Sequence, residues 1–191
     1  MIPDTSQIYF PAEDTHLLIR AALAEVKESD RVLEVGTGSG AVAKAVMTMA
    51  KNTAATEINP HAAAYAAAEG VAVVRGNLLD PIRGEFDLIL FNAPYLPTTP
   101  EERMNDWLEF ALDGGETGRK VIEWFLPAAI DHLSLFGRIL LLVSSETGVP
   151  ELLSLCKQYR MIGIVAETEQ MEDGERLYVL RISRDLCCIE R

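Results

Sequence analysis

The apolar positions in the first half of the chain alternate between short continuous runs and runs in which they recur every three or four residues. Continuous runs of this length predict buried strands, and the wider spacing predicts amphipathic helices. We therefore expect helices at 13–26, from the glycine loop to about Ala50, and at 60–69, with strands at 31–35, 53–57 and 71–75. This alternation predicts right-handed crossovers and a parallel sheet with helices on both faces.

The second half continues the alternation and then changes it. A strand is expected at 86–90, a helix at 119–135, a strand at 137–144 and a helix at 150–159, followed by strands at 162–169 and 177–183. The turn signal Asp173-Gly174 makes the last two strands a hairpin, so that one strand runs antiparallel. No linker, repeat or low-complexity tract interrupts the pattern. The sequence thus predicts an α/β fold, with a seven-stranded, mostly parallel sheet in a single domain, 1–191.

Composition narrows the class of protein. Of the 191 residues, 49 % are hydrophobic and 24 % are charged, as in globular proteins. No apolar run reaches the roughly 20 residues needed to span a bilayer, and no signal segment begins the chain, so we expect a cytoplasmic protein without membrane contact. The three cysteines, Cys156, Cys187 and Cys188, lack the spacing of a zinc site. They favour free thiols, and we expect no bound metal.

The charge bears on the kind of partner. The formal net charge is −12, and the longest basic run is the pair Arg119-Lys120. A protein that binds nucleic acid through its own surface needs clustered Lys and Arg to neutralise phosphates. The charge therefore weighs against direct nucleic-acid binding and suits a basic protein partner, although a salt-rich cytoplasm also favours an acidic surface.

The strand at 86–90 is followed by Phe91-Asn92-Ala93-Pro94-Tyr95, in which the prolines at 94 and 97 allow neither strand nor helix to continue. A carboxamide, a carbonyl ahead of a proline and an aromatic face thus follow one another at the exit from the sheet. A primary amide or amino group can be bound there, with its two N–H groups donated to the Asn92 side-chain oxygen and the Ala93 carbonyl and its plane against Tyr95. The alternative interpretation is an ordinary proline-rich turn.

A glycine loop marks the first strand-to-helix turn. Gly36, Gly38 and Gly40 allow the backbone to approach a ligand closely, although their spacing is not the dinucleotide pattern. Glu57, about 20 residues on, ends the second strand, where a carboxylate can accept hydrogen bonds from both hydroxyls of a ribose. Asn77 and Leu78 follow the third strand and suit an adenine edge and face. Each feature alone can be a tight turn, but in this order they predict a nucleoside-bearing cofactor.

Two of these motifs resemble those of known enzymes. Glu34-Val35-Gly36-Thr37-Gly38-Ser39-Gly40 resembles the first motif of the class I S-adenosylmethionine-dependent methyltransferases, and Asn92-Ala93-Pro94-Tyr95 resembles the Asn-Pro-Pro-Tyr motif of those that methylate planar amide or amino nitrogens. With Tyr9, the segment Pro11-Ala12-Glu13-Asp14-Thr15, the glycines of 114–118 and the closing run 175–181, the chain is similar over almost its whole length to the short HemK-type glutamine methyltransferases of archaea and eukaryotes. That family modifies the glutamine of the Gly-Gly-Gln motif in class I translation termination (release) factors.

The resemblance implies a class I methyltransferase Rossmann-like fold, with S-adenosyl-L-methionine as cofactor and Asn92, Ala93, Pro94 and Tyr95 around the acceptor amide. The residues that it places around the cofactor are Thr15, Glu34, Gly36, Gly38, Gly40, Glu57, Asn77, Leu78 and Asn92. Glu57 and Asn77 depart from the family's usual aspartate. Ala93 replaces the first proline of the motif, which keeps the carbonyl but loosens φ.

The favoured hypothesis is direct in-line methyl transfer to the side-chain amide nitrogen of a protein glutamine. One alternative moves the acceptor to a base amino group in RNA or DNA, or to a protein lysine. Another is a non-catalytic cofactor-binding subunit, suggested only by Ala93. The resemblance also implies a class I release factor as the protein substrate.

A partner subunit is a further expectation. The resemblance implies a small zinc-ribbon activator subunit that adds to the sheet edge. The strand at 71–75 is expected at that edge and is apolar, which favours pairing with another chain. We therefore expect a heterodimer, and the alternative is a monomer whose edge is shielded by its own helix.

Other residues that can carry chemistry receive simpler roles. We expect His16, His61 and His132 to be structural or on the surface, and Trp107 and Trp124 to lie in the core, with stacking on the substrate as the alternative. Asp113 either shapes the acceptor pocket or caps a turn or helix.

Overall fold

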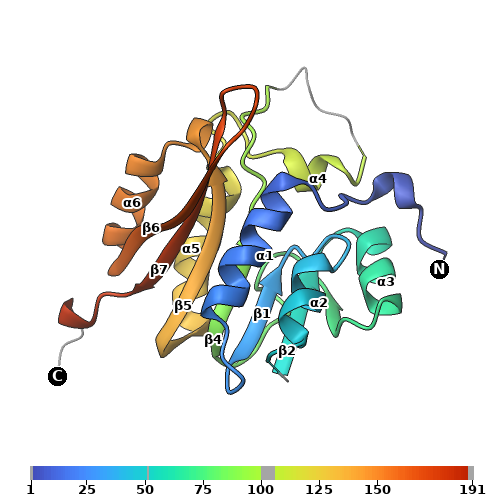
Figure 1. Ribbon diagram of the computed structural model, residues 1–191, viewed down its shortest axis with the longest axis horizontal. Helices are drawn as coiled ribbons and strands as arrows, with labels where there is room; N and C mark the ends of the chain where they lie inside the picture. Colours follow the sequence, from blue (N-terminus) through green and yellow to red (C-terminus); the bar gives the residue numbers. More distant parts are fainter. Residues whose placement is uncertain (1, 51, 100–105, 189–191) are drawn as a thin grey trace.

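A computed structural model describes residues 2–50, 52–99 and 106–188 and contains one seven-stranded sheet in the order β3-β2-β1-β4-β5-β7-β6 (Figure 1). Neighbouring strands from β3 to β5 are parallel, and β7 is antiparallel to both β5 and β6. The expected α/β class, the seven strands and the closing hairpin are therefore confirmed.

The helices and strands follow the expected order closely. The strands are β1 (Arg31–Val35), β2 (Asn52–Glu57), β3 (Val73–Arg75), β4 (Phe86–Asn92), β5 (Leu133–Ser144), β6 (Met161–Gln170) and β7 (Arg176–Arg184). The helices are α1 (Glu13–Glu25), α2 (Ala41–Met47), α3 (Pro60–Ala68), α4 (Glu109–Leu112), α5 (Lys120–His132) and α6 (Val149–Gln158), with short 3-10 turns at Thr5–Gln7, Ser145–Thr147 and Leu186–Cys188. None of the described helices is long and apolar enough to cross a membrane.

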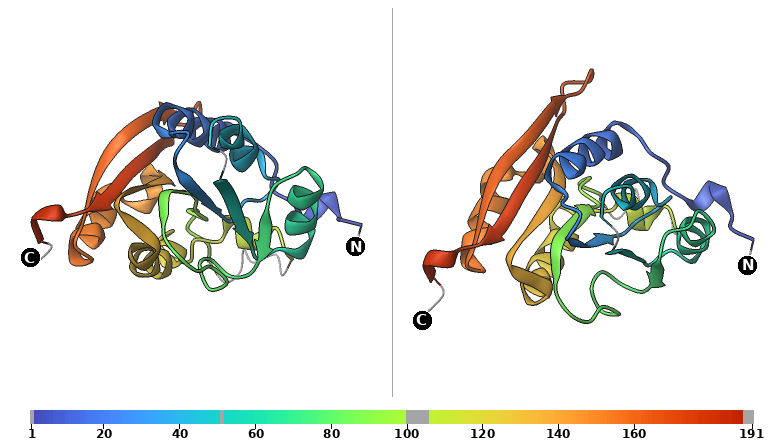
Figure 2. Two further views of the ribbon diagram at one scale, coloured as in Figure 1. Left: turned by 90° about the horizontal axis from the view of Figure 1, so that it is seen from below. Right: turned by 60° about the horizontal axis from the view of Figure 1, so that its bottom comes forward.

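Helices cover both faces of the sheet, so its central strands are buried on two sides. In Figure 2, α1 and α2 lie on one side of the sheet and α5 on the other. Successive residues of β4 alternate between these layers: Leu88 and Leu90 pack with α1 and α2, whereas Ile89 and Phe91 pack with α5 and α6. Burial on both faces explains why these strands are continuous apolar runs in the sequence.

The structure corrects the expected helix at 119–135. Helix α5 ends at His132, and Leu133 has extended backbone angles and pairs with Phe86 of β4. The register of the β4–β5 pair then shifts before Arg138 pairs with Leu88. The apolar residues after Leu133 suggested a longer helix, but Leu135 and Phe136 are exposed in the structure. They do not form the buried face that a continued helix needs.

The third strand is shorter than expected. It begins at Val73, because Val71 donates its N–H to the Ala66 carbonyl and packs with Ala43 and Ala66 under α2 and α3. The strand nevertheless lies at one edge of the sheet, as expected.

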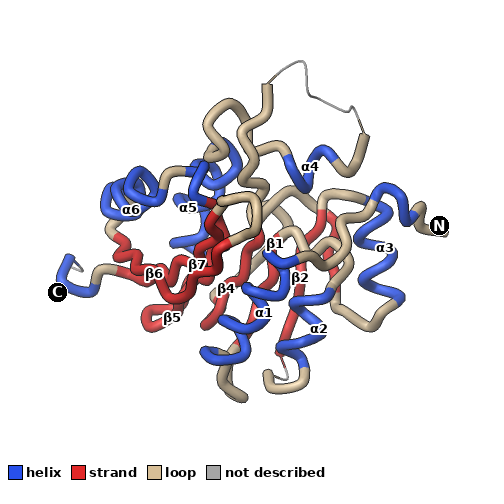
Figure 3. The backbone as a smooth tube through the Cα atoms, turned by 45° about the horizontal axis from the view of Figure 1, so that its top comes forward, coloured by secondary structure: helices blue, strands red, loops and turns tan. Residues whose placement is uncertain are grey.

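The sheet order reverses direction between β1 and β4. In open α/β sheets, ligands bind outside the carboxyl ends of the strands at such a point. Figures 1 and 3 show α4, the beginning of α1 and the loops after β1 and β4 gathered at that edge. The fold therefore brings the glycine loop and the segment after Asn92 to one place.

Candidate active site

A cavity of about 450 Å³ opens at the carboxyl ends of β1, β2 and β4. Ligand pockets typically have volumes of roughly 300–1,000 Å³. The described residues that line it include nearly all the predicted site residues: Thr15, Glu34, Gly36, Gly38, Glu57, Asn77, Leu78, Asn92, Ala93, Pro94 and Tyr95. Gly40 does not line it. A Cβ at Gly40 would press against Val71 and Ala66, so the role of this glycine is close packing of α2 against α3.

Glu34 joins the glycine loop to helix α2 from inside the protein. Its side chain is buried, and Oε2 accepts hydrogen bonds from the Thr37 hydroxyl and, at 2.9 Å, from the Ala43 N–H. Burial raises the pKa of Glu34 to about 8 from its ordinary value of 4.5. Glu34 therefore holds the loop in shape, and it carries a proton through much of the neutral range.

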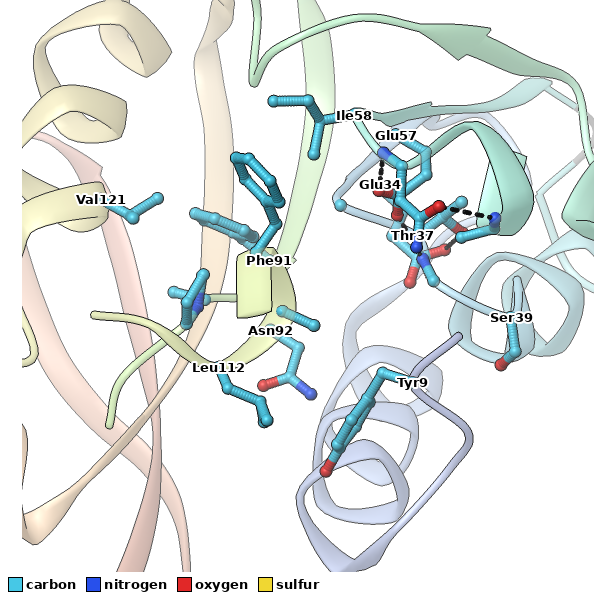
Figure 4. Close-up of a pocket in the computed structure, with 18 of the residues that line it drawn as sticks. Tyr9, Glu34, Thr37, Ser39, Glu57, Ile58, Phe91, Asn92, Leu112 and Val121 are labelled. Atoms are coloured by element: carbon cyan, nitrogen blue, oxygen red, sulfur yellow. Dashed lines mark hydrogen bonds between the residues drawn. The ribbon is translucent and has the colours of Figure 1, made fainter. Parts of the chain in front are cut away.

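Glu57 supports the same loop from the end of β2. Its Oε2 accepts the Gly38 N–H at 2.7 Å and its Oε1 accepts the Asn59 N–H at 2.8 Å, while burial raises its pKa. A carboxylate oxygen can accept two hydrogen bonds. The carboxylate of Glu57, which lines the cavity, thus keeps capacity for a hydroxyl donor (Figure 4).

The turn after β3 presents an apolar side chain to the cavity. Leu78 has a φ of +44°, which is rare for a residue with a side chain. The turn is closed by the Asp80 N–H, which donates to the Asn77 carbonyl. Leu78 and Ile58 both line the cavity and provide apolar contacts there, beside the exposed Asn77.

Asn92 ends β4 and lies at the middle of the site. Its Nδ2 donates to Asp14 Oδ2 at 2.9 Å, and its Oδ1 is buried without a hydrogen-bond partner. Figure 4 shows the nitrogen turned toward the side of Tyr9 and the oxygen turned toward the side of Leu112. Among the described residues, two other buried side-chain oxygens, of Thr56 and Glu175, also lack a partner, but neither residue lines the cavity.

Asp14 is a site residue that the sequence reasoning did not select. It is 5 % exposed at the start of α1, and its Oδ2 also accepts the Tyr9 hydroxyl at 2.9 Å. Its Oδ1 accepts both the backbone N–H and the hydroxyl of Thr15. The only available signal was its place in the segment Pro11-Ala12-Glu13-Asp14-Thr15, because its partner Asn92 is 78 residues away.

The loop at 113–118 supports the segment after Asn92. The Gly114 N–H donates to the Leu96 carbonyl at 2.9 Å, and the Thr98 N–H donates to the Gly115 carbonyl at 3.0 Å. A Cβ at Gly118 would collide with the carbonyl oxygen of Tyr95. Asp113 has the turn role, since its Oδ1 accepts the Gly115 N–H at 2.7 Å.

Aromatic residues line the cavity beside α4 and α5. Trp107 and Phe110 lie 5.3 Å apart between ring centroids, and Lys120 Nζ lies 5.3 Å from the ring of Trp124. The prediction that Trp124 belongs to the core is wrong, because its side chain is 58 % exposed. Part of the loop at 96–107 lies outside the described residues.

The three histidines have the expected structural or surface roles. His16 is exposed, His132 is partly buried with its Nδ1 2.9 Å from the Gly84 carbonyl oxygen, and His61 accepts the Asp4 N–H at 3.0 Å through Nδ1. Across the part of the chain that the structure describes, no three His, Cys, Asp or Glu side chains are grouped as metal ligands would be.

Comparison with known proteins assigns the family. No protein-family model matches the chain. Methyltransferase HEMK2 of Mus musculus is 38 % identical over 194 residues, covering 93 % of this chain and 90 % of the mouse protein. The chain belongs to the HemK family of glutamine methyltransferases. The expected family and the expected methyltransferase class are therefore confirmed.

Two further HemK relatives extend the comparison. The release factor glutamine methyltransferase of Deinococcus radiodurans is 36 % identical over 186 residues, which cover 88 % of this chain and 64 % of the bacterial protein. A solved chain of the E. cuniculi Mtq2–Trm112 complex, which is responsible for methylation of the eRF1 translation termination factor, is 27 % identical with a TM-score of 0.76, covering 93 % of this chain and 99 % of the other. The HemK chain thus shares its fold with class I methyltransferases.

Proposed function

We propose that this protein transfers a methyl group from S-adenosyl-L-methionine to the side-chain amide nitrogen of a glutamine in a class I translation termination factor, within its Gly-Gly-Gln motif. The observation that carries the proposal is the state of the Asn92 carboxamide oxygen. Asn92 lines the cavity, and its oxygen is buried and accepts no hydrogen bond. A primary amide supplies that donor. The relatives named for release factor glutamine methylation support the choice of acceptor.

The cavity suits the proposed cofactor. Gly36 has a φ of +63° and lines the cavity, while the carboxylate of Glu57 keeps acceptor capacity for a ribose hydroxyl. Leu78 would contact the adenine face, Asn77 its edge, and Thr15 the methionine part. When bound, S-adenosylmethionine supplies an electrophilic methyl group on its sulfonium.

The acceptor would be held through both of its N–H groups. Asn92 Oδ1 accepts one hydrogen bond and the Ala93 carbonyl accepts the other, while Tyr95 covers the amide plane. Because the lone pair of an amide nitrogen is delocalised, these bonds favour the charge that develops as the nitrogen attacks. Positioning of this kind contributes up to roughly 7–11 kcal/mol in ideal cases. Since Asn92 Oδ1 is shielded from water, the side chains around it must move aside to admit the acceptor.

The neighbouring ionisable groups do not act as bases. Asp14 accepts hydrogen bonds from Tyr9, from Asn92 and from two groups of Thr15, and the Tyr95 hydroxyl also interacts with it, so its oxygens are already engaged by donors. Burial and the charge of Asp14 raise the pKa of both Tyr9 and Tyr95, so these phenols keep their protons at neutral pH. The proton of the acceptor nitrogen is therefore released to water after the nitrogen is alkylated, when it has become acidic.

The test is methyl transfer from labelled cofactor to purified termination factor, to its Gln→Ala variant in the Gly-Gly-Gln motif, and to bulk tRNA and rRNA. The proposal expects label in the factor and none in the variant or the RNA. Label in RNA alone would overturn it and favour the nucleic-acid alternative. Cofactor binding without transfer to any of these acceptors would point to a non-catalytic subunit.

We further propose that a small zinc-ribbon activator subunit pairs with the free edge of β3. Among the described strands β3 pairs only with β2, and its Val74 is 45 % exposed. An unpaired apolar edge is a site for strand addition. The Mtq2 relative was solved as a complex with Trm112, which supports a partner of this kind.

The edge pairing can be tested with matched variants on the two edge strands. Val74→Glu on β3 is expected to abolish copurification with a Trm112-type partner. Ile164→Glu on β6 changes a residue of similar exposure, 53 %, at the opposite edge and should leave the complex intact. Loss of the complex in both variants, or in neither, would contradict the proposal.

A further inference from the structure

Asp14 is the most fully bonded carboxylate beside the acceptor site. Its Oδ1 accepts the backbone N–H and the hydroxyl of Thr15, and its Oδ2 accepts the Tyr9 hydroxyl and Asn92 Nδ2, the latter two at 2.9 Å. The side chain is 5 % exposed and is held at the first turn of α1. Its position is thus fixed by α1 and does not depend on Asn92.

The contact between Asp14 and Asn92 determines which end of the carboxamide faces the site. An ionised carboxylate only accepts hydrogen bonds, so the end of Asn92 that contacts Asp14 must be the nitrogen. The carbonyl oxygen then points away from Asp14, and this is the oxygen that lacks a partner. A carboxamide in the opposite orientation would face the acceptor with N–H groups and repel an incoming amide N–H.

We propose that Asp14 is a positioning residue that fixes the Asn92 carboxamide with its oxygen toward the acceptor, and so makes the site selective for an N–H donor such as a primary amide. The inference rests on the proposed function and adds the residue that sets its polarity. Tyr9 assists, because burial and Asp14 raise the pKa of its phenol and keep it a donor to Oδ2.

The substitution Asp14→Asn tests this directly because the replacement carboxamide can bind in only one orientation. The Thr15 backbone N–H is an obligate donor, so the oxygen of the introduced side chain must occupy the place of Oδ1. The nitrogen of the introduced side chain then takes the place of Oδ2 and faces the Asn92 nitrogen, donor against donor. Turning the Asn92 carboxamide over removes this conflict but presents its N–H groups to the acceptor.

The experiment compares the wild type and Asp14→Asn with two peptides, one containing Gly-Gly-Gln and one containing Gly-Gly-Glu. The wild type is expected to bind the Gln peptide more tightly and to methylate it. In Asp14→Asn, kcat/KM for the Gln peptide should fall by about 100-fold. The preference in binding should also reverse, because the carboxylate of the Glu peptide only accepts hydrogen bonds. If Asp14 had only a structural role, the substitution would weaken the binding of both peptides to the same extent.

Two controls separate the possible failures. Calorimetry should show that Asp14→Asn binds S-adenosylmethionine with an affinity close to that of the wild type, which establishes a folded site. Tyr9→Phe removes a donor to the same oxygen without changing the polarity of Asp14, and should lower transfer by less than about tenfold with no reversal of preference. A wild type that methylates neither peptide nor intact factor would refute the proposed function. A wild type that methylates the Gln peptide, with unchanged preference in Asp14→Asn, would refute only the role of Asp14.

A measurement on the wild type covers the case in which Asp14→Asn does not fold. Asn92 Nδ2 and the Tyr9 hydroxyl donate to one oxygen, so their protons are near each other. Nuclear Overhauser contacts are expected between the Asn92 side-chain amide protons and the Tyr9 ring. Their absence in a spectrum with assigned Asn92 amide signals would overturn the inferred orientation.

Discussion

The two halves of the cavity are built in different ways. Around the glycine loop, the hydrogen-bond partners of the two buried glutamates lie at most 19 residues away in sequence: Glu34 accepts from Thr37 and Ala43, and Glu57 accepts from Gly38 and Asn59. Around Asn92, the bonds connect β4 with the first turn of α1, and one carboxamide oxygen has no donor. The glutamates of the cofactor half are thus held by contacts of short sequence separation, whereas the acceptor half depends on a contact across 78 residues and on an incoming donor.

The largest effect should come from removing the acceptor carboxamide. Asn92→Ala is expected to lower kcat by about 1,000-fold, because it removes an interaction made as charge develops on the nitrogen. Its affinity for the cofactor, measured by calorimetry, should change by less than about tenfold. The matched control is Asn77→Ala, another carboxamide that lines the cavity, which should weaken cofactor binding and spare kcat at saturation. If Asn92→Ala weakened cofactor binding and Asn77→Ala lowered kcat, the roles assigned to these two carboxamides would be wrong.

The substitution Glu57→Gln should weaken cofactor binding. Both oxygens of Glu57 accept backbone N–H groups, so either orientation of the glutamine amide places its nitrogen against an obligate donor. We expect the Kd for S-adenosylmethionine to rise roughly 10- to 100-fold. The kcat at saturating cofactor should change little. A large fall in kcat with unchanged Kd would contradict a role for Glu57 in binding.

Glycine-to-alanine substitutions can test whether the loop at 113–118 supports the acceptor half. Gly118 has a φ of +68°, and an added Cβ would collide with the Tyr95 carbonyl oxygen. Gly118→Ala should lower the free energy of unfolding by about 1–3 kcal/mol and raise KM for the acceptor. Gly84 has a φ of +85° with open space around it, so Gly84→Ala should show only the backbone cost of about 1–2 kcal/mol. Equal acceptor KM values for the two variants would show that Tyr95 is not positioned by this loop.

A further prediction concerns the pH dependence of stability in the cofactor half. Burial raises the pKa of Glu34 from 4.5 to about 8. Between these values the folded protein binds a proton that the unfolded chain has released. The free energy of unfolding should therefore fall as pH rises through this window.

Glu34→Gln is the matched variant for that measurement. Glutamine is neutral and keeps an oxygen for Thr37 and Ala43, so the stability of the variant should depend less on pH. Urea unfolding at several values from about pH 5 to pH 8 gives both curves. Parallel curves would show that Glu34 does not titrate in this range.

Much of the fold could be predicted because most strands carry an unambiguous pattern. Strand β4 is buried on both faces along 88–91, which is a continuous apolar run, and β1 is mostly apolar and buried apart from its first residue. The beginning of β5 was not predicted, because the apolar residues Leu133, Leu135 and Phe136 fit a helix or a strand equally well until their tertiary contacts are known. Only Leu133 is buried, and it pairs with a strand almost fifty residues earlier.

Some residues of the candidate site could be predicted from the sequence, and others could not. Residues whose role depends on backbone shape, such as Gly36 and Gly38, could be located from spacing alone. Asp14 could not, because its function is defined by Asn92. Gly40 belongs to the same motif, but contact with Ala66 and Val71 assigns it to packing. Outside the site, the ion pair of Arg138 could not be predicted either, because only the fold brings its buried guanidinium to within 2.7 Å of Asp30.

The most direct test locates the transferred methyl group by tandem mass spectrometry of a termination factor treated with S-adenosylmethionine and either the wild type or Asn92→Ala. We predict one methyl group on the side-chain nitrogen of the Gly-Gly-Gln glutamine with the wild type, and almost none with the variant. A methyl group on another residue, or equal modification by both proteins, would contradict a site in which the Asn92 oxygen receives the acceptor amide.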